Sequence, residues 1–221
     1  MKRLPLFLAL LSLSCALPAL ADEDAESGDG VLVVNGCRIE RDSQCPNADL
    51  RNANLSNQDM RHMNLSGADL RGADLRHTLL DLVNLQNAKL QKANLTRASL
   101  QQANLRQADF TDSSLVAIQG WGLFAQGAQF QNADMRGANL EFARVSGAQM
   151  HDVNLQAANL EMTWLSKADL KGADLQDANL QEVKLGESNL ENAVLTGSRT
   201  RFGNFLEANM VGCTDCPKGW D

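Results

Sequence analysis

The chain has 221 residues, of which 44% are hydrophobic and 21% are charged, and its 20 basic and 27 acidic residues give a net charge of −7. An acidic chain without a basic patch lacks the electrostatic footprint of a nucleic-acid-binding protein. We therefore exclude nucleic acid as a partner.

Residues 1–21 have the features of a secretory signal peptide. Lys2 and Arg3 precede an apolar run, and small residues ending at Ala21 come just before an acidic stretch. A lipoprotein signal at Cys15 is the less favoured alternative. The run is short and contains proline, so no transmembrane span is predicted. Cleavage after Ala21 would make the protein periplasmic or secreted.

Residues 22–45 are expected to form an acidic segment and an N-terminal cap. Removal of Lys2 and Arg3 would leave 18 basic and 27 acidic residues, and seven of these acids lie between residues 22 and 42. The stretch "VLVVNGCRIERDSQC" indicates a strand, a turn at Asn35-Gly36 and a second strand. In an oxidising compartment we expect a disulfide between Cys37 and Cys45.

Residues 46–212 repeat with a step of five. Leu, Phe, Met or Val occupies 30 of the 33 positions reached in steps of five from Leu50 to Met210, and Ala stands two residues earlier in 20 of 33 cases. A step of five scatters side chains around an α-helix, and it alternates faces along a continuous strand. The pattern instead predicts a short extended piece with Ala and Leu inward, followed by a tight turn. Successive coils would then pair their backbones about 4.8 Å apart.

The segments "ADLRGADLRH", "ANLTRASLQQANLRQADF" and "ADLKGADLQDANL" resemble the A-(D/N)-L-x-x signature of the pentapeptide repeat family. The resemblance implies an all-β fold, a right-handed quadrilateral β-helix with four pentapeptides per coil. Residues 46–212 would then make about eight coils and a rod about 40 Å long at the usual strand spacing.

Asp or Asn precedes the central residue in many repeats, which raises the question of a calcium ladder. Stacking every twentieth residue gives no continuous carboxylate column, and calcium would lack ligands. Asp and Asn also suit turns. No metal or other cofactor is predicted; the column in question runs Asp49, Asp69, Lys89, Asp109, Gln129 and Gln149.

Residues 116–125 break the pattern. Gly120 and Ala125 occupy central positions, whereas Ile118 and Leu123 occupy the small ones. The frame resumes unshifted, so these residues form either two distorted sides or a loop of two whole repeats. The exchange of large and small residues favours sides.

A candidate binding surface follows if residues 116–125 are sides. Twenty-residue stacking then gathers outward apolar side chains on one part of the rod, which is unusual for a soluble protein. The alternative is that the two aromatic residues of the interrupted segment fold over the others and shield them. The surface comprises Leu82, Phe142, Met162 and Phe202 in one column, Phe124 and Trp164 in the next, and Trp121 beside them.

Residues 213–221 are expected to cap the other end, with a Cys213–Cys216 disulfide and Trp220 as a plug. A thioredoxin-like site is the alternative, but it needs a strand-to-helix setting that is missing from the sequence. A zinc site shared by both cysteine pairs is disfavoured because the pairs should lie at opposite ends of the rod.

No catalytic constellation is recognisable, and the three histidines, His62, His77 and His151, have no motif around them. The best-known activity of the resembling family is inhibition or protection of DNA gyrase by DNA-mimicking rods. An export signal and a nearly neutral first half argue against that role here. We therefore expect a non-enzymatic exported scaffold that binds a protein or an envelope component. A homodimer is compatible with the sequence.

Overall fold

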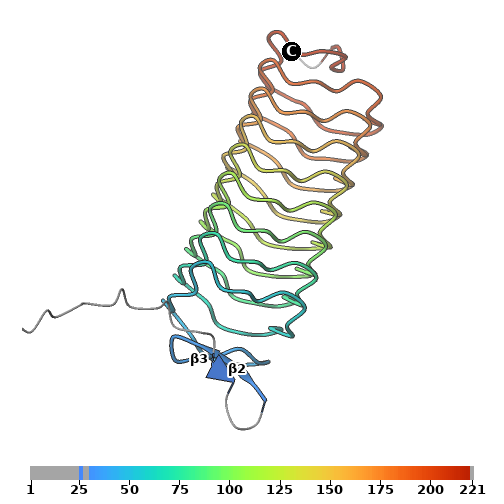
Figure 1. Cartoon of the computed structure of the whole chain (residues 1–221). Coiled ribbons are helices and arrows are strands. Elements are labelled where there is room, and N and C mark those ends of the chain that lie inside the picture. Colours follow the sequence, from blue (N-terminus) through green and yellow to red (C-terminus); the bar gives the residue numbers. More distant parts are fainter. Residues whose placement is uncertain (1–24, 27–29, 220–221) are drawn as a thin grey trace, which may run out of the picture.

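The computed structural model describes residues 25–26 and 30–219, which form a rod with a small cap at one end (Figure 1). The chain advances steadily along the rod from the N-terminal to the C-terminal end. In the described part, no helix could span a membrane. The expected signal peptide lies outside the described residues.

The N-terminal cap is a three-stranded antiparallel sheet of order β1-β2-β3, with strands β1 (Ala25–Glu26), β2 (Leu32–Val34) and β3 (Cys37–Arg38). The hairpin between β2 and β3 is as predicted, because Asn35 (φ 47°) and Gly36 (φ 79°) adopt the left-handed conformation that a two-residue hairpin turn requires. Strand β1 was not expected from the sequence.

Two contacts attach this cap to the first coil. The side-chain amide of Asn35 donates to the Asp49 carbonyl at 2.8 Å. The predicted disulfide between Cys37 and Cys45 is formed. The cap therefore closes the N-terminal end of the apolar core, as a solenoid requires.

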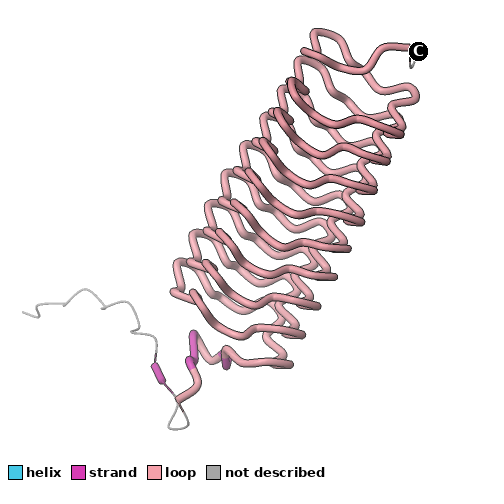
Figure 2. Tube along the Cα trace, turned by 90° about the vertical axis from the view of Figure 1, so that its right-hand side faces the viewer, coloured by secondary structure: helices cyan, strands magenta, loops and turns pink. Residues whose placement is uncertain are grey.

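The body is a coil of 20 residues with four five-residue sides. Parallel bridges join each residue that precedes a central position to the residue 20 places later, from Gln44↔Asn64 to Val194↔Thr214. Each bridge is a single residue long, so the body is drawn as loop in Figure 2 and the named strands appear only in the cap. The 20-residue coil agrees with the expected quadrilateral solenoid.

Each side is held by two kinds of hydrogen bond. The Leu50 N–H donates to the Asp69 carbonyl at 2.8 Å, and the Asp69 N–H donates to the Ala48 carbonyl at 2.9 Å, so neighbouring coils share a backbone ladder. Within the side, the Ala53 N–H donates to the Leu50 carbonyl at 3.2 Å and closes the corner. These bonds satisfy the backbone groups that a single coil would leave unpaired.

The second residue of each corner adopts a left-handed conformation, for example Asn52 (φ 56°) and Gly72 (φ 70°). Glycine and asparagine tolerate this region better than other residues. The corner therefore explains why small or polar residues dominate the second position after the central leucine.

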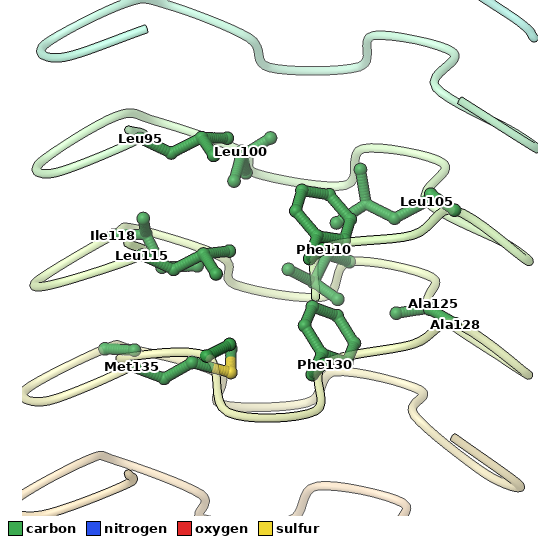
Figure 3. Close-up of a cluster of buried hydrophobic side chains, with 14 of the residues drawn as sticks. Leu95, Leu100, Leu105, Phe110, Leu115, Ile118, Ala125, Ala128, Phe130 and Met135 are labelled. Carbon is green, nitrogen blue, oxygen red and sulfur yellow. The ribbon is translucent and has the colours of Figure 1, made fainter. Parts of the chain in front are cut away.

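The core consists of the central and small residues, nearly all fully buried. Phe110 and Phe130 stack on successive coils with ring centroids 5.1 Å apart (Figure 3). Where threonine replaces the small alanine, its hydroxyl is satisfied: Thr78 donates to the Leu55 carbonyl at 3.0 Å. The core is thus apolar with its few hydroxyl groups paired.

Residues 116–125 form two sides of the coil, and the alternative of a loop is wrong. The Gly120 N–H donates to the Asn139 carbonyl at 2.7 Å, as central residues do elsewhere, so the sides are regular rather than distorted. Ile118 and Leu123 are buried, and a Cβ placed on Gly120 would lie 2.5 Å from Leu123 Cδ2. Leu123, three positions after Gly120, therefore fills core volume that a side chain at residue 120 would otherwise occupy.

The regular turns continue to residue 214, where the chain leaves the last coil. Cys213 and Cys216 are disulfide-bonded, as expected, and no described helix adjoins them. Trp220, the expected plug, lies outside the described residues.

Candidate binding face

The predicted surface residues lie along one corner of the rod and on the side that follows it. The bridges Phe124↔Arg144 and Arg144↔Trp164 confirm the second column and place an arginine between the two aromatic residues. We call the following set the aromatic face: Trp121, Phe124, Phe142, Arg144, Met162 and Trp164.

The corner of this face carries an unusual set of left-handed residues. Leu82 (φ 60°), Phe142 (φ 59°), Met162 (φ 54°) and Phe202 (φ 62°) are the described positive-φ residues that are apolar and larger than alanine. All four are spaced by multiples of 20 and therefore share one column. A non-glycine residue in this region costs on the order of 1–3 kcal/mol. Asparagine or glycine, common at the other corners, would lower that cost.

Gly122 creates a hollow in the middle of the column. A Cβ on Gly122 would meet only the Gln102 Cγ, at 3.7 Å. The missing side chain leaves an open hollow of about 260 Å³ between the coils. It is lined by Gln102, Trp121, Gly122, Phe124, Phe142 and Arg144.

The rings around the hollow contact one another but remain partly exposed. Trp121 and Phe142 pack edge to face with centroids 5.9 Å apart, a favourable arrangement for aromatic pairs. Their exposed fractions are still 40% and 43%, and that of Trp164 is 53%. Shielding, the alternative expected for Trp121 and Phe124, is therefore incomplete.

Two arginines stack on these rings. The Arg106 guanidinium lies 4.8 Å from the Phe124 ring centroid, and the Arg144 guanidinium lies 5.4 Å from Phe124 and 5.6 Å from Trp164. The alternation of cations and rings runs along the rod axis, and cation–π contacts of this kind are attractive. Sequence reasoning missed both arginines, although Arg144 stands exactly 20 residues from Phe124 and from Trp164.

The structure does not bring all predicted surface residues together. Two residues without an apolar side chain, Gln102 and Gly122, separate Leu82 from Phe142 in the column. Glu182 likewise separates Met162 from Phe202. The predicted column is therefore a central cluster with two outlying apolar residues.

Five arginines elsewhere on the rod each pair with the aspartate two residues earlier. Arg51 donates to both carboxylate oxygens of Asp49, and this lowers the pKa of Asp49 to about 2. Side-chain hydrogen bonds from arginine also lower the pKa of Asp69 and Asp134. The pairs that repeat this geometry are Asp49–Arg51, Asp59–Arg61, Asp69–Arg71, Asp74–Arg76 and Asp134–Arg136.

Other candidate chemistry is sparse in the described residues. They contain no cluster of three His, Cys, Asp or Glu side chains suited to a metal. The Asp49 column bridges in the predicted order, through Asp69 and Lys89. His151 lies 3.3 Å from the Asp152 carboxylate at the surface, and His62 and His77 occupy corner positions.

The described residues therefore define a four-sided β-solenoid with one aromatic face. The family model for pentapeptide repeats matches residues 48–87, 78–115, 124–152, 133–172 and 173–214. The chain belongs to the pentapeptide repeat family, whose members fold as right-handed quadrilateral β-helices.

Solved structures of the same family are similar to this chain. A trypsin-treated form of QnrB1, described as a plasmid-mediated fluoroquinolone resistance protein, is 20% identical with a TM-score of 0.59 over 79% of this chain and 90% of QnrB1. HetL, described as involved in heterocyst differentiation regulation in the cyanobacterium Nostoc sp. strain PCC 7120, is 25% identical with a TM-score of 0.39 over 78% of this chain and 87% of HetL. The likeness to QnrB1 shows the fold alone. No curated protein matches the chain.

Proposed function

We propose that this protein is a non-enzymatic, exported scaffold that binds a protein partner through its aromatic face. The observation that carries the proposal is the set of exposed rings around the Gly122 hollow. Protein interfaces are enriched in Trp, Phe, Met and Arg, the residue types gathered here. Bulky residues at strained corners, where asparagine would fit better, also support a role outside folding.

Export rests on the signal-like segment of residues 1–21 and on the two disulfides. Disulfides form and persist in oxidising compartments such as the periplasm. The expected mature N-terminus is Asp22. Expression of the full chain with a C-terminal tag in a bacterium with an outer membrane, followed by fractionation and N-terminal sequencing, tests this. Recovery from the cytoplasm with Met1 retained would overturn it.

A DNA-mimicking gyrase inhibitor is the alternative, and the charges of the rod do not support it. A DNA mimic should present continuous negative charge, like the phosphates it replaces. In the first half, aspartates such as Asp49 and Asp69 are paired with arginines. The unpaired Arg144 lies in the second half. Binding of the purified rod to gyrase in the absence of DNA would revive this alternative.

Protein binding is tested with a face variant and a matched control. Phe142→Asn combined with Trp164→Gln removes two exposed rings, and asparagine suits the left-handed corner. Val211→Gln makes the same apolar-to-polar change at a different, exposed corner. A partner captured from an envelope extract by the parent protein and by Val211→Gln, but not by the double variant, supports the proposal. Equal capture by all three would contradict it. A homodimer stays a prediction, which light scattering of the rod tests.

A further inference from the structure

The aromatic face holds two arginines that form no ion pair with a described carboxylate. Arg51, Arg71 and Arg136 each form an ion pair with the aspartate two residues earlier. In contrast, Arg144 stands two residues after Phe142, and no described carboxylate lies within ion-pair distance of it or of Arg106. The guanidinium charge at the hollow is therefore open to a partner.

The contacts of Arg144 with two rings leave its guanidinium N–H groups available to a partner. Its guanidinium carbon lies 5.4 Å from the Phe124 ring centroid and 5.6 Å from the Trp164 ring centroid, and contacts with rings leave the guanidinium N–H donors unused. A guanidinium edge matches a carboxylate and can donate two parallel hydrogen bonds to it. Arg106 is partly used, because it donates to the Asn104 side-chain oxygen at 3.0 Å. Arg144 is thus the principal donor at this site.

The Gly122 hollow lies directly beside this donor, since Arg144 is one of its lining residues. Its other walls include Trp121, Phe124 and Phe142, so the hollow suits an apolar or aromatic side chain. We infer that the aromatic face binds an acidic–apolar peptide segment, with an apolar side chain in the Gly122 hollow and an adjacent carboxylate on Arg144. This inference rests on the proposed scaffold function and specifies the chemistry of the partner.

Acidic residues lie on one side of the corner and Arg144 lies on the other. Glu141 precedes Phe142 and Glu161 precedes Met162, whereas Arg144 follows the corner. Glu161 already accepts a hydrogen bond from Asn179 at 2.9 Å. A bound carboxylate is therefore favoured on the Arg144 side of the corner and repelled on the Glu141 side.

A glycan or a lipid surface fits these features less well. Sugars stack on open ring faces, but Phe124 has Arg106 over it from the preceding coil and Arg144 over it from the next. An anionic membrane would be repelled by Glu141, Glu161 and Glu182 along the same corner. A peptide that carries one apolar group beside one acid meets both requirements.

The test uses three capped pentapeptides and the isotope-labelled mature protein. The probes are Ser-Ser-Phe-Glu-Ser, its lysine counterpart Ser-Ser-Phe-Lys-Ser, and Ser-Ser-Ser-Glu-Ser, which lacks the apolar group. The readout is the shift of the indole N–H signals of Trp121 and Trp164, assigned with Trp→Phe variants. The acidic phenylalanine peptide should bind saturably, and the other two at least about tenfold more weakly, because a charge-assisted pair and a buried ring are each lost.

Variants assign the effect to Arg144. Arg144→Gln should weaken binding of the acidic peptide at least about tenfold. Arg144→Lys, which keeps the charge but not the planar fork, should weaken it less. Lys89→Gln is the matched control, because Lys89 precedes a central residue on another side of the rod; it should leave binding within about twofold, since an exposed distant charge is screened.

Three results would overturn the inference. These are equal binding of the lysine peptide, no effect of Arg144→Gln, and stronger shifts with anionic lipid vesicles or a neutral hexasaccharide than with the acidic peptide. If a partner is still captured through the aromatic face in any of these cases, the scaffold function stands and only the acidic–apolar chemistry fails. If no face-dependent capture is seen either, both fall.

Discussion

The exchange of large and small residues at Gly120 and Leu123 makes a quantitative prediction about core packing. Leu123 replaces a small residue, and its side chain fills the space that a central leucine would otherwise occupy. The cavity left beside it is only about 10 Å³, about the size of one water molecule. Each position should therefore be intolerant of the usual repeat residue unless the other changes too.

The single changes have opposite defects. Gly120→Leu overpacks the core, because even its Cβ would lie 2.5 Å from Leu123 Cδ2 and 3.1 Å from Leu140 Cδ2; we expect a loss of about 3 kcal/mol or more. Leu123→Ala leaves a void and should destabilise by about 2–5 kcal/mol. The double variant places the usual residue type at positions 120 and 123 and nearly conserves the total side-chain volume, so we expect its stability to lie within about 1.5 kcal/mol of the parent's. The coupling energy should thus be about 3 kcal/mol or larger.

Urea unfolding followed by far-ultraviolet circular dichroism measures the free energy of unfolding of the parent, the two single variants and the double variant. Leu123→Ala combined with Leu65→Ala, in a distant coil, is the control and should be additive. A double variant of Gly120 and Leu123 that is as unstable as the sum of its single changes would refute volume exchange as the reason for the pattern.

Three further predictions concern the core, the cap and the surface pairs. Leu105→Asp should destabilise the rod by about 5 kcal/mol or more, because it places an unpaired charge in the fully buried core; a cooperative transition close to the parent's would contradict this. Replacing Cys37 and Cys45 by Ser should remove about 2–3 kcal/mol and fray the cap while the β-type spectrum of the rod persists, and thiol titration of the denatured, unreduced mature protein should find no free cysteine. The hydrogen bonds from Arg51 lower the pKa of Asp49 from 3.8 to about 2, so their contribution is present above pH 4 and is lost as the pH falls toward 2; Arg51→Gln should flatten that part of the pH–stability curve, and an unchanged curve would count against it.

The five-residue step made the interior predictable from the sequence. A leucine that recurs every fifth residue leaves few ways to bury it, and each inward position depends only on its own repeat. The hairpin at Asn35-Gly36 was equally accessible, because its turn residues act locally. Strand β1 was not, since Ala25–Glu26 is two residues long and shows no alternating pattern.

The outer surface was harder to predict because it depends on neighbours 20 residues apart. The columns of Phe124 and Trp164 followed from the period alone. The hollow at Gly122 did not, because it arises from what a glycine omits between Gln102 and Phe142. The guanidinium of Arg144 was overlooked because the sequence does not show whether a flexible arginine side chain contacts a ring, as Arg144 does, or an aspartate, as Arg51 does.

Because inward and outward positions are separate in this fold, bulky apolar residues at exposed left-handed corners are not explained by core packing. In this solenoid the core residues determine the fold. The hydrogen bonds between coils do not depend on the type of side chain at a corner, since the Phe142 N–H donates to the Glu161 carbonyl just as other corner residues donate to a carbonyl of the next coil. Folding alone thus gives no reason to hold phenylalanine or methionine in a left-handed conformation when asparagine would stabilise the same turn. Those residues gather in the single column that borders the Gly122 hollow and the unpaired Arg144. Long polar residues such as Lys92 and Arg97 hold the same left-handed conformation at other corners, so the exposed ring surface is what distinguishes this column. That surface is explained if a partner covers the corner and recovers on binding what the free rod loses in stability.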